Sequence, residues 1–141
     1  MTWDLIIFDC DGVLVDSERI ANRVLAEVMT EAGWPMTTAE SVATFMGLSE
    51  RSSRRIIDQR FGQPMPGIFE QFYVRLYDAF AAELKPILGV EEALDAIGAN
   101  AWPTCVASSG SHEKMGMTLE KTGLRERFAG RVFSAHDVAR G

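Results

Sequence analysis

Two aspartates follow a short apolar run near the start of the chain. The run is Leu5 to Phe8, and Asp9 and Asp11 come directly after it, on either side of Cys10. Side chains at positions i and i+2 of an extended segment point the same way, so both carboxylates face one site. Paired carboxylates can hold a hard divalent cation or exchange protons with a substrate.

The surrounding residues leave these carboxylates without a local counter-charge. Residues 1–18 contain no Lys or Arg and five acids, which are Asp4, Asp9, Asp11, Asp16 and Glu18. Carboxylates that converge must be neutralised by protonation, by bases from elsewhere in the chain or by a bound cation. A hard divalent ion is the simplest of these three answers.

The element that positions the pair is a predicted strand. The apolar run that ends at Phe8 contains two Ile and is typical of a strand buried on both faces of a parallel sheet. Gly12 lets the backbone turn tightly as it leaves the strand. The carboxyl ends of parallel strands are where open α/β sheets bind ligands, so we expect a binding site here.

The string from Asp9 to Glu18, DCDGVLVDSE, resembles the first motif of the haloacid dehalogenase-like hydrolases. The resemblance is to the branch with a helical cap, which includes sugar-phosphate phosphatases and β-phosphoglucomutase. It implies that Asp9 is the nucleophile, that Asp11 is the acid/base, and that Mg²⁺ binds Asp9 and the backbone carbonyl of Asp11. An Asp-Gly turn that merely ends a strand is the alternative, and it explains a bare Asp-x-Asp better than it explains ten residues.

Four helices are predicted between this motif and the rest of the sheet. Their expected ranges are Ser17 to about Gly33, with Ser17 as the cap, then 38–45, about 50–61, and 68–84. Arginines on the third helix indicate a solvated face, with substrate contact as the alternative. By resemblance residues 15–84 form a helical cap, and the loops at Glu18 and Gly47 select the substrate.

The sheet resumes with a strand over 103–107, after a short helix over 90–97. A helix over 112–122 and a strand over 131–134 follow, and this order predicts a right-handed parallel crossover. The expected fold is therefore α/β: a Rossmann-like parallel sheet, incomplete with its first three strands, formed by residues 1–14 and 85–141, with the helical cap inserted.

The second predicted strand also ends in polar residues. Its carboxyl end is followed by Ser108, Ser109, Gly110 and Ser111. A hydroxyl followed by a helix N-terminus can hold a phosphate, and the segment resembles the family's second motif. The resemblance implies that Ser108 binds the transferring phosphoryl group, assisted by the amide of Ser109. A plain helix-capping loop is the alternative.

Two later motifs of the family have no counterpart in this chain. They supply a Lys that stabilises the phosphoryl group and acids that complete the Mg²⁺ shell; Lys114 and Lys121 do not match them. We therefore expect either a portion of a larger protein or a chain that pairs with a partner or with itself through the exposed edge of the first strand.

The composition limits the classes of molecule that the chain is expected to bind. The net charge of -6 and the pI of about 4.9 disfavour nucleic acid and anionic membranes. Cys10 and Cys105 are expected to be buried free thiols, and His112 and His136 to lie at the surface. The start of the chain has no signal-peptide pattern or membrane span, so a cytoplasmic location is predicted.

These observations favour a Mg²⁺-dependent phosphatase that acts on a small phosphomonoester, most plausibly a sugar phosphate. A phosphomutase is an alternative, although Glu50 stands where the resembling mutases have an Arg, and Arg51 is one position further on. A catalytically incomplete fragment or binding module is another alternative. The long helical insertion argues against a phosphorylatable receiver domain.

Overall fold

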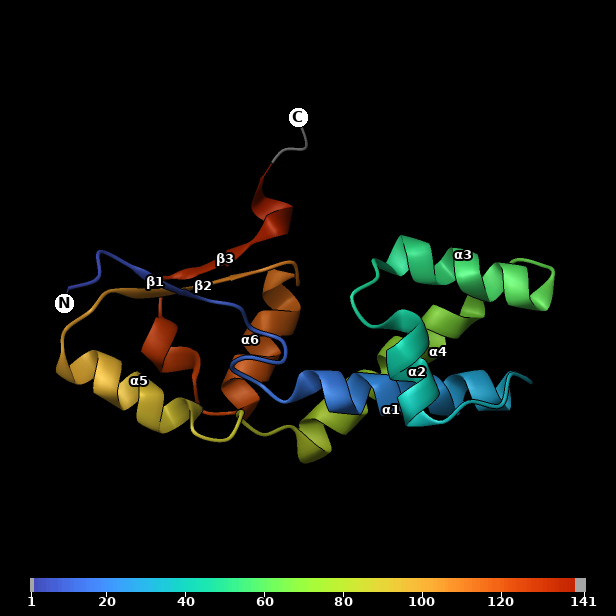
Figure 1. Cartoon of the computed structure of the whole chain (residues 1–141), viewed down its shortest axis with the longest axis horizontal. Helices are drawn as coiled ribbons and strands as arrows, with labels where there is room; N and C mark the ends of the chain where they lie inside the picture. The colour runs from blue at the N-terminus through green and yellow to red at the C-terminus, as the bar shows by residue number, and fades with distance from the viewer. Residues whose placement is uncertain (1, 139–141) are drawn as a thin grey trace. The chain divides into compact units, whose positions relative to one another are not determined.

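A computed structural model describes residues 2–138, which include a parallel sheet of three strands (Figure 1). The strands are β1 (Ile6–Phe8), β2 (Thr104–Ser108) and β3 (Val132–Ser134), in the order β1-β2-β3. In the register of the sheet, Phe8 pairs with Val106 and Ser108 pairs with Ser134. The predicted α/β fold with three parallel strands is confirmed.

The chain divides into two compact units. The first comprises residues 1–18 and 80–141, and the second comprises residues 19–79. Helices α1 (Ser17–Glu31) and α4 (Gly67–Glu83) contribute residues to both. The assignment of residues 1–14 and 85–141 to a catalytic core, and of residues 15–84 to a cap, stays a prediction.

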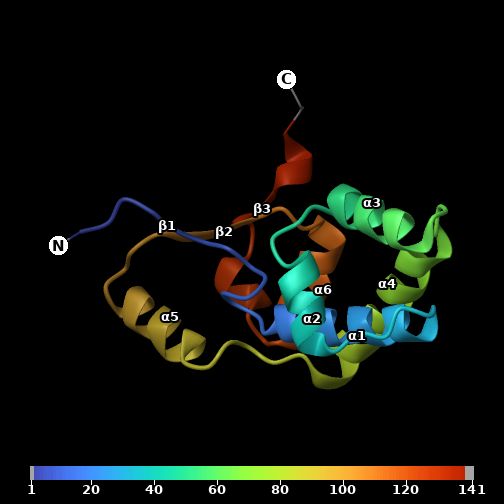
Figure 2. The same ribbon diagram turned by 45° about the vertical axis from the view of Figure 1, so that its right-hand side comes forward.

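Helices cover one face of the sheet. They are α5 (Val90–Ala99), α6 (His112–Lys121) and the 3₁₀ helix η1 (Arg125–Phe128), and they lie on the same side of the strands in both views (Figure 2). Val106 of β2 and Phe128 of η1 are fully buried. The rings of Phe8 and Phe128 pack edge-on, with their centroids 5.9 Å apart. Burial of these apolar side chains holds the strand ends in place.

The opposite face of the sheet is exposed, so within the described residues β1 is not buried on both faces as its apolar pattern alone indicates. Ile7 is 61% exposed and Leu5 is 47% exposed, and Phe133 on β3 points to the same face. Strand β1 is therefore buried on one face only, because α5, α6 and η1 all lie on the other. Within the described residues β1 is an edge strand, as expected; self-association through it stays a prediction.

The second unit is helical. Helices α2 (Thr38–Phe45) and α3 (Glu50–Phe61) are capped at their N-termini by the hydroxyls of Thr37 and Ser49. The apolar side chains of Ile68, Phe72 and Leu76 on α4 are buried. On α3, Arg51, Arg55 and Arg60 are exposed as expected, whereas Arg54 is partly buried over the ring of Phe69. The second 3₁₀ helix, η2 (Ala135–Asp137), follows β3 in the first unit. No helix in residues 2–138 is both long and apolar enough to cross a membrane.

Candidate active site

The loop after β1 is wound tightly around one carbonyl. The carbonyl oxygen of Cys10 accepts hydrogen bonds from the backbone N–H groups of Leu14 and Val15, at 3.0 and 3.2 Å. The N–H of Gly12 donates to the carbonyl of Val15 at 2.9 Å, and Gly12 has a φ of 73°. Only glycine adopts this left-handed conformation without a steric penalty. The loop thus turns back on itself directly after the two aspartates.

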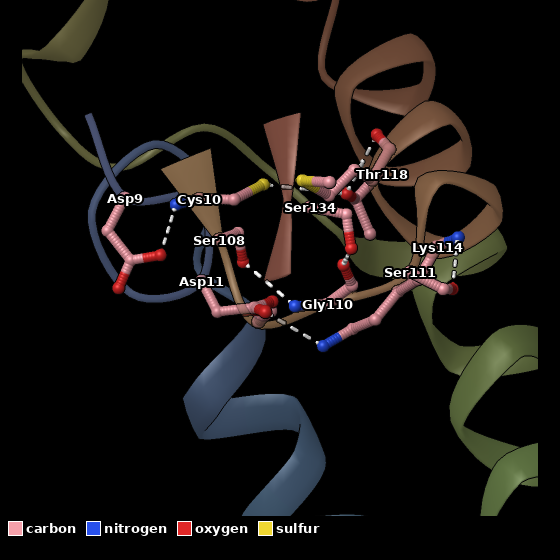
Figure 3. Close-up of polar contacts among 11 residues, drawn as sticks. Asp9, Cys10, Asp11, Ser108, Gly110, Ser111, Lys114, Thr118 and Ser134 are labelled. Carbon is pink, nitrogen blue, oxygen red and sulfur yellow. Dashed lines mark hydrogen bonds and ion pairs between the residues drawn. The ribbon is translucent and has the colours of Figure 1, made fainter. Parts of the chain in front are cut away.

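Asp11 is held through both of its carboxylate oxygens. The hydroxyl of Ser17 donates to Oδ1 at 2.7 Å. The ammonium of Lys114 donates to Oδ2 at 2.9 Å (Figure 3). The side chains of Asp11 and Lys114 are each 25% exposed. The prediction that Ser17 caps α1 is corrected: Ser17 is the first residue of the helix, and its hydroxyl donates to Asp11. The start of α1 thereby fixes the orientation of this carboxylate.

Asp9 lies beside Asp11 with different contacts. Its Oδ1 accepts a hydrogen bond from the N–H of Cys10 at 2.7 Å, and the residue is exposed. Within residues 2–138 no Lys, Arg or His forms an ion pair with Asp9. One oxygen is thus fixed by the backbone while the carboxylate as a whole stays accessible, as a nucleophile or a metal ligand must be.

Glu18 packs over the glycine of the same loop. A β-carbon built on Gly12 would lie 2.8 Å from both Cδ and Oε2 of Glu18. This carboxylate therefore occupies the space that any larger residue at position 12 would need. The predicted substrate-selecting residue Glu18 lies next to the aspartate loop, whereas Gly47 belongs to the second unit; the role of each stays a prediction.

The loop after β2 forms a second polar turn. Ser108 is only 9% exposed, and its hydroxyl oxygen accepts the N–H of Gly110 at 3.1 Å. The hydroxyl of Ser134 donates to the carbonyl of Gly110 at 2.6 Å, which ties the loop to the end of β3. The hydroxyl of Ser111 accepts the N–H of Lys114 and caps α6, so this predicted capping role is confirmed. Ser109 is exposed.

The two loops meet at Gly110. A β-carbon on Gly110 would lie 3.5 Å from Oγ of Ser108, 3.8 Å from Oδ2 of Asp11 and 3.8 Å from Cδ of Lys114. A hydroxyl, a carboxylate and the stem of a lysine thus surround one point at the carboxyl edge of the sheet (Figure 3). The structure brings Asp11 and Ser108 together there, as the sequence predicts.

Lys114 is the residue that the sequence analysis missed. It does not match the family's Lys motif, and its contact with Asp11 spans 103 residues of sequence. The available signal was weak: a lysine in the first turn of the helix that follows the phosphate-type loop. Lys114 supplies one of the distant bases expected to neutralise the acidic segment.

The donor set suits a magnesium ion only in part. The carboxylate of Asp9 and the backbone carbonyl of Asp11 are hard oxygen donors of the kind that Mg²⁺ prefers. Within the described residues no group of three or more His, Cys, Asp or Glu side chains could hold a metal. Mg²⁺ takes six ligands, so water, substrate oxygens or groups outside residues 2–138 would complete its shell.

Cys10 is shielded between the two aspartates. Its side chain is 1% exposed, and its Sγ lies 3.9 Å from the hydroxyl of Thr118. Burial, followed by the neighbouring charge of Asp11, raises the pKa of the Cys10 thiol to about 11. Cys10 is therefore a protonated core residue, and both cysteines are buried and free as predicted.

A hydrogen bond between side chains links the start of α6 with the segment after β3. Nε2 of His112 lies 2.8 Å from Oδ2 of Asp137, which also accepts the N–H of Ser134 at 3.0 Å. The N–H of Ser134 and then His112 lower the pKa of Asp137. His112 and His136 are exposed, as expected, but the pairing of His112 was not foreseen.

Comparison with known proteins places this geometry in context. The family model described as haloacid dehalogenase-like hydrolase matches residues 6–141. The 6-phosphogluconate phosphatase of Escherichia coli (strain K12) is 30% identical over 142 residues, which cover 97% of this chain and 62% of that protein.

Two solved structures of haloacid dehalogenase-like proteins are also similar to this chain. A conserved haloacid dehalogenase-like protein of unknown function from Agrobacterium tumefaciens is 35% identical with a TM-score of 0.85, over 97% of this chain and 61% of the other. A HAD family hydrolase from Deinococcus radiodurans, with bound phosphate and sodium, is 26% identical with a TM-score of 0.76, over 95% and 58%. The chain spans about three fifths of the length of these relatives.

Proposed function

We propose that this chain, which belongs to the haloacid dehalogenase-like hydrolase family, carries the nucleophilic half of a phosphatase site for small phosphomonoesters. The observation that carries the proposal is the meeting of the two loops at Gly110, where Asp11 and Ser108 surround one point, while the same aspartate loop carries the accessible Asp9. The arrangement combines a nucleophile, a proton carrier and a phosphate-binding hydroxyl, which phosphoryl transfer requires.

In the first proposed step, a carboxylate oxygen of Asp9 attacks the phosphorus of the ester. The bond between phosphorus and the ester oxygen breaks, and Asp11 gives its proton to the departing alcohol. The product is a phosphoryl group on Asp9. The hydroxyl of Ser108, with the amide of Ser109, hydrogen-bonds the phosphoryl oxygens during the transfer.

In the second step, Asp11 acts as a base. It takes a proton from a water molecule, whose oxygen attacks the phosphorus, and the bond between phosphorus and Asp9 breaks. Inorganic phosphate leaves, while Asp9 is again a carboxylate and Asp11 is again protonated. The hydrogen bond from Ser17 keeps Asp11 in one orientation through both proton transfers.

Magnesium is part of the proposal. Asp9 and the backbone carbonyl of Asp11 would hold the ion, which when bound would offset the negative charge of the phosphoryl group and of Asp9. Asp9 has no cationic partner among the described residues, whereas Asp11 has Lys114. The uncompensated carboxylate is therefore the one assigned to the metal.

The proposed substrate is a small phosphorylated metabolite, with a sugar phosphate favoured. Support comes from the Escherichia coli relative, which is a 6-phosphogluconate phosphatase, and from the Deinococcus relative, whose structure contains phosphate. We propose that the second unit acts as the cap that selects the substrate.

The test is phosphate release from a panel of sugar phosphates, measured with and without Mg²⁺. We expect metal-dependent release that falls at least 100-fold in Asp9→Asn, because the variant lacks the carboxylate proposed to attack phosphorus. Asp4→Asn, which removes an exposed acid from the same segment, is the matched control and should keep full activity. Equal activity of the Asp9 variant and the control would refute the assignment.

A further inference from the structure

We propose, resting on the phosphatase function above, that Lys114 is a specificity residue that binds an anionic substituent on the leaving group of the substrate. The site would then prefer phosphomonoesters that carry a second negative charge, such as a carboxylate, close to the ester oxygen. Nothing in the family's first or second motif assigns this residue a role.

The first step of the argument concerns the oxygen that moves the proton. Oδ1 of Asp11 accepts the hydroxyl of Ser17, whose side chain is only 2% exposed and lies at the start of α1. Oδ2 faces Gly110 and Ser108, where the phosphoryl group is proposed to bind. Oδ2 is therefore the oxygen that exchanges a proton with the leaving group.

The second step concerns the reach of Lys114. Its ammonium lies 2.9 Å from Oδ2. A leaving-group oxygen that takes the proton must approach Oδ2 to within about 3 Å. The ammonium and the leaving-group oxygen are then at most about 6 Å apart, whatever the angle between them. A substituent a few bonds from the ester oxygen can therefore contact the ammonium.

The third step concerns the position of the Lys114 ammonium in the first turn of α6. Lys114 lies in the first turn of α6, where the helix dipole disfavours positive charge. Within the described residues its ammonium has one carboxylate partner, Asp11, and its side chain is 25% exposed and so open to a ligand. In the view of Figure 3, Asp11 lies between Asp9 and Lys114, so the cation is on the side of Asp11 away from the nucleophile. Helix stability alone does not favour this placement, whereas recognition of the leaving group does.

The test compares two ligands that differ by one charge. Glycerol 3-phosphate and 3-phosphoglycerate share a three-carbon skeleton and a primary phosphate ester, and the second has a carboxylate in place of a hydroxymethyl group. Binding is measured by titration calorimetry in the full chain with Asp9→Asn, which prevents turnover. Lys114→Met is then added to this background. Lys121→Met, at the exposed last turn of the same helix, is the matched control.

We expect 3-phosphoglycerate to bind about ten- to hundredfold more tightly than glycerol 3-phosphate, as for one charge-assisted hydrogen bond. Lys114→Met should abolish this ratio while leaving the affinity for glycerol 3-phosphate nearly unchanged, and Lys121→Met should preserve the ratio. Urea unfolding of each variant confirms that the fold is intact.

Two outcomes would overturn the inference, and a third would overturn the proposed function on which it rests. Equal weakening of both ligands by Lys114→Met would mean that Lys114 binds the shared phosphate. An unchanged ratio would mean that Lys114 only holds Asp11 in place. Failure of both ligands to bind even with Lys114 present would overturn the phosphomonoester site itself, and so distinguishes a failure of the proposed function from a failure of this inference.

Discussion

Replacing Gly12 by alanine should destabilise the chain more than the same change at any other left-handed glycine whose surroundings are open. Gly12 and Gly123 have almost the same positive φ, 73° and 74°. A β-carbon at Gly123 meets nothing within 4 Å, whereas at Gly12 it would lie 2.8 Å from Cδ and Oε2 of Glu18. The two sites therefore share the backbone cost and differ in the contact.

The magnitudes follow from these two terms. A left-handed conformation costs an L-residue about 1 to 2 kcal/mol, so Gly123→Ala should lower the free energy of unfolding by about that amount. In Gly12→Ala the Glu18 side chain must also leave its rotamer, which adds roughly 0.5 to 1.5 kcal/mol. We expect a total loss of about 1.5 to 3.5 kcal/mol for Gly12→Ala.

Urea unfolding of both variants, together with Glu18→Ala and the double variant Gly12→Ala/Glu18→Ala, provides the assay. Removing Glu18 removes the clash, so the double variant should be more stable than the sum of the single losses by roughly 0.5 to 1.5 kcal/mol. The double-mutant cycle subtracts any other interaction of Glu18. Equal losses at Gly12 and Gly123, or a coupling energy of zero, would refute the reasoning.

Two further predictions concern titratable groups. The lowered pKa of Asp137 means that its contribution to stability is present above the ordinary pKa of an aspartate, near 4, and is lost as the pH falls below that value through the folded-state pKa. Asp137→Asn should therefore flatten the acid side of the stability profile measured by urea unfolding, and an unchanged profile would contradict the assigned contacts. Cys10, buried and with a pKa of about 11, should react with iodoacetamide at pH 8 far more slowly in the native chain than in urea, as followed by mass spectrometry of its peptide. Equally fast labelling in both conditions would show that the thiol is not enclosed.

Local sequence patterns predicted most of the elements because the forces that set them are local. The caps, the left-handed glycines and the apolar stripes lie within a few residues of the elements that they define. The bounds moved by one or two residues, as for β2, which is Thr104–Ser108 against an expected range of 103–107. Ser108 thereby becomes the last residue of the strand rather than the first residue of the loop.

The contacts that the sequence did not reveal depend on tertiary placement. Lys114 meets Asp11 only because α6 packs beside the loop after β1, and no local pattern encodes a pairing across 103 residues. The exposure of Ile7 also depends on tertiary placement, because a strand has the same apolar pattern whether helices cover one face of its sheet or both faces. The hydroxyl of Ser17 could cap a helix or donate to a carboxylate, and the position of Asp11 decided between them.

The central claim is that Asp9 is the nucleophile, and that Asp11 is the base that activates water to hydrolyse the phosphoryl group on Asp9. In Asp11→Asn, para-nitrophenyl phosphate should still transfer its phosphoryl group in the presence of Mg²⁺, because its leaving group departs without a proton, but the phosphoryl group should stay on Asp9. Rapid mixing should show a burst of about one nitrophenolate per chain, and mass spectrometry should find the phosphoryl group on the Asp9 peptide. A burst that persists when Asp9 is also replaced by Asn, or a label on another residue, would contradict the claim.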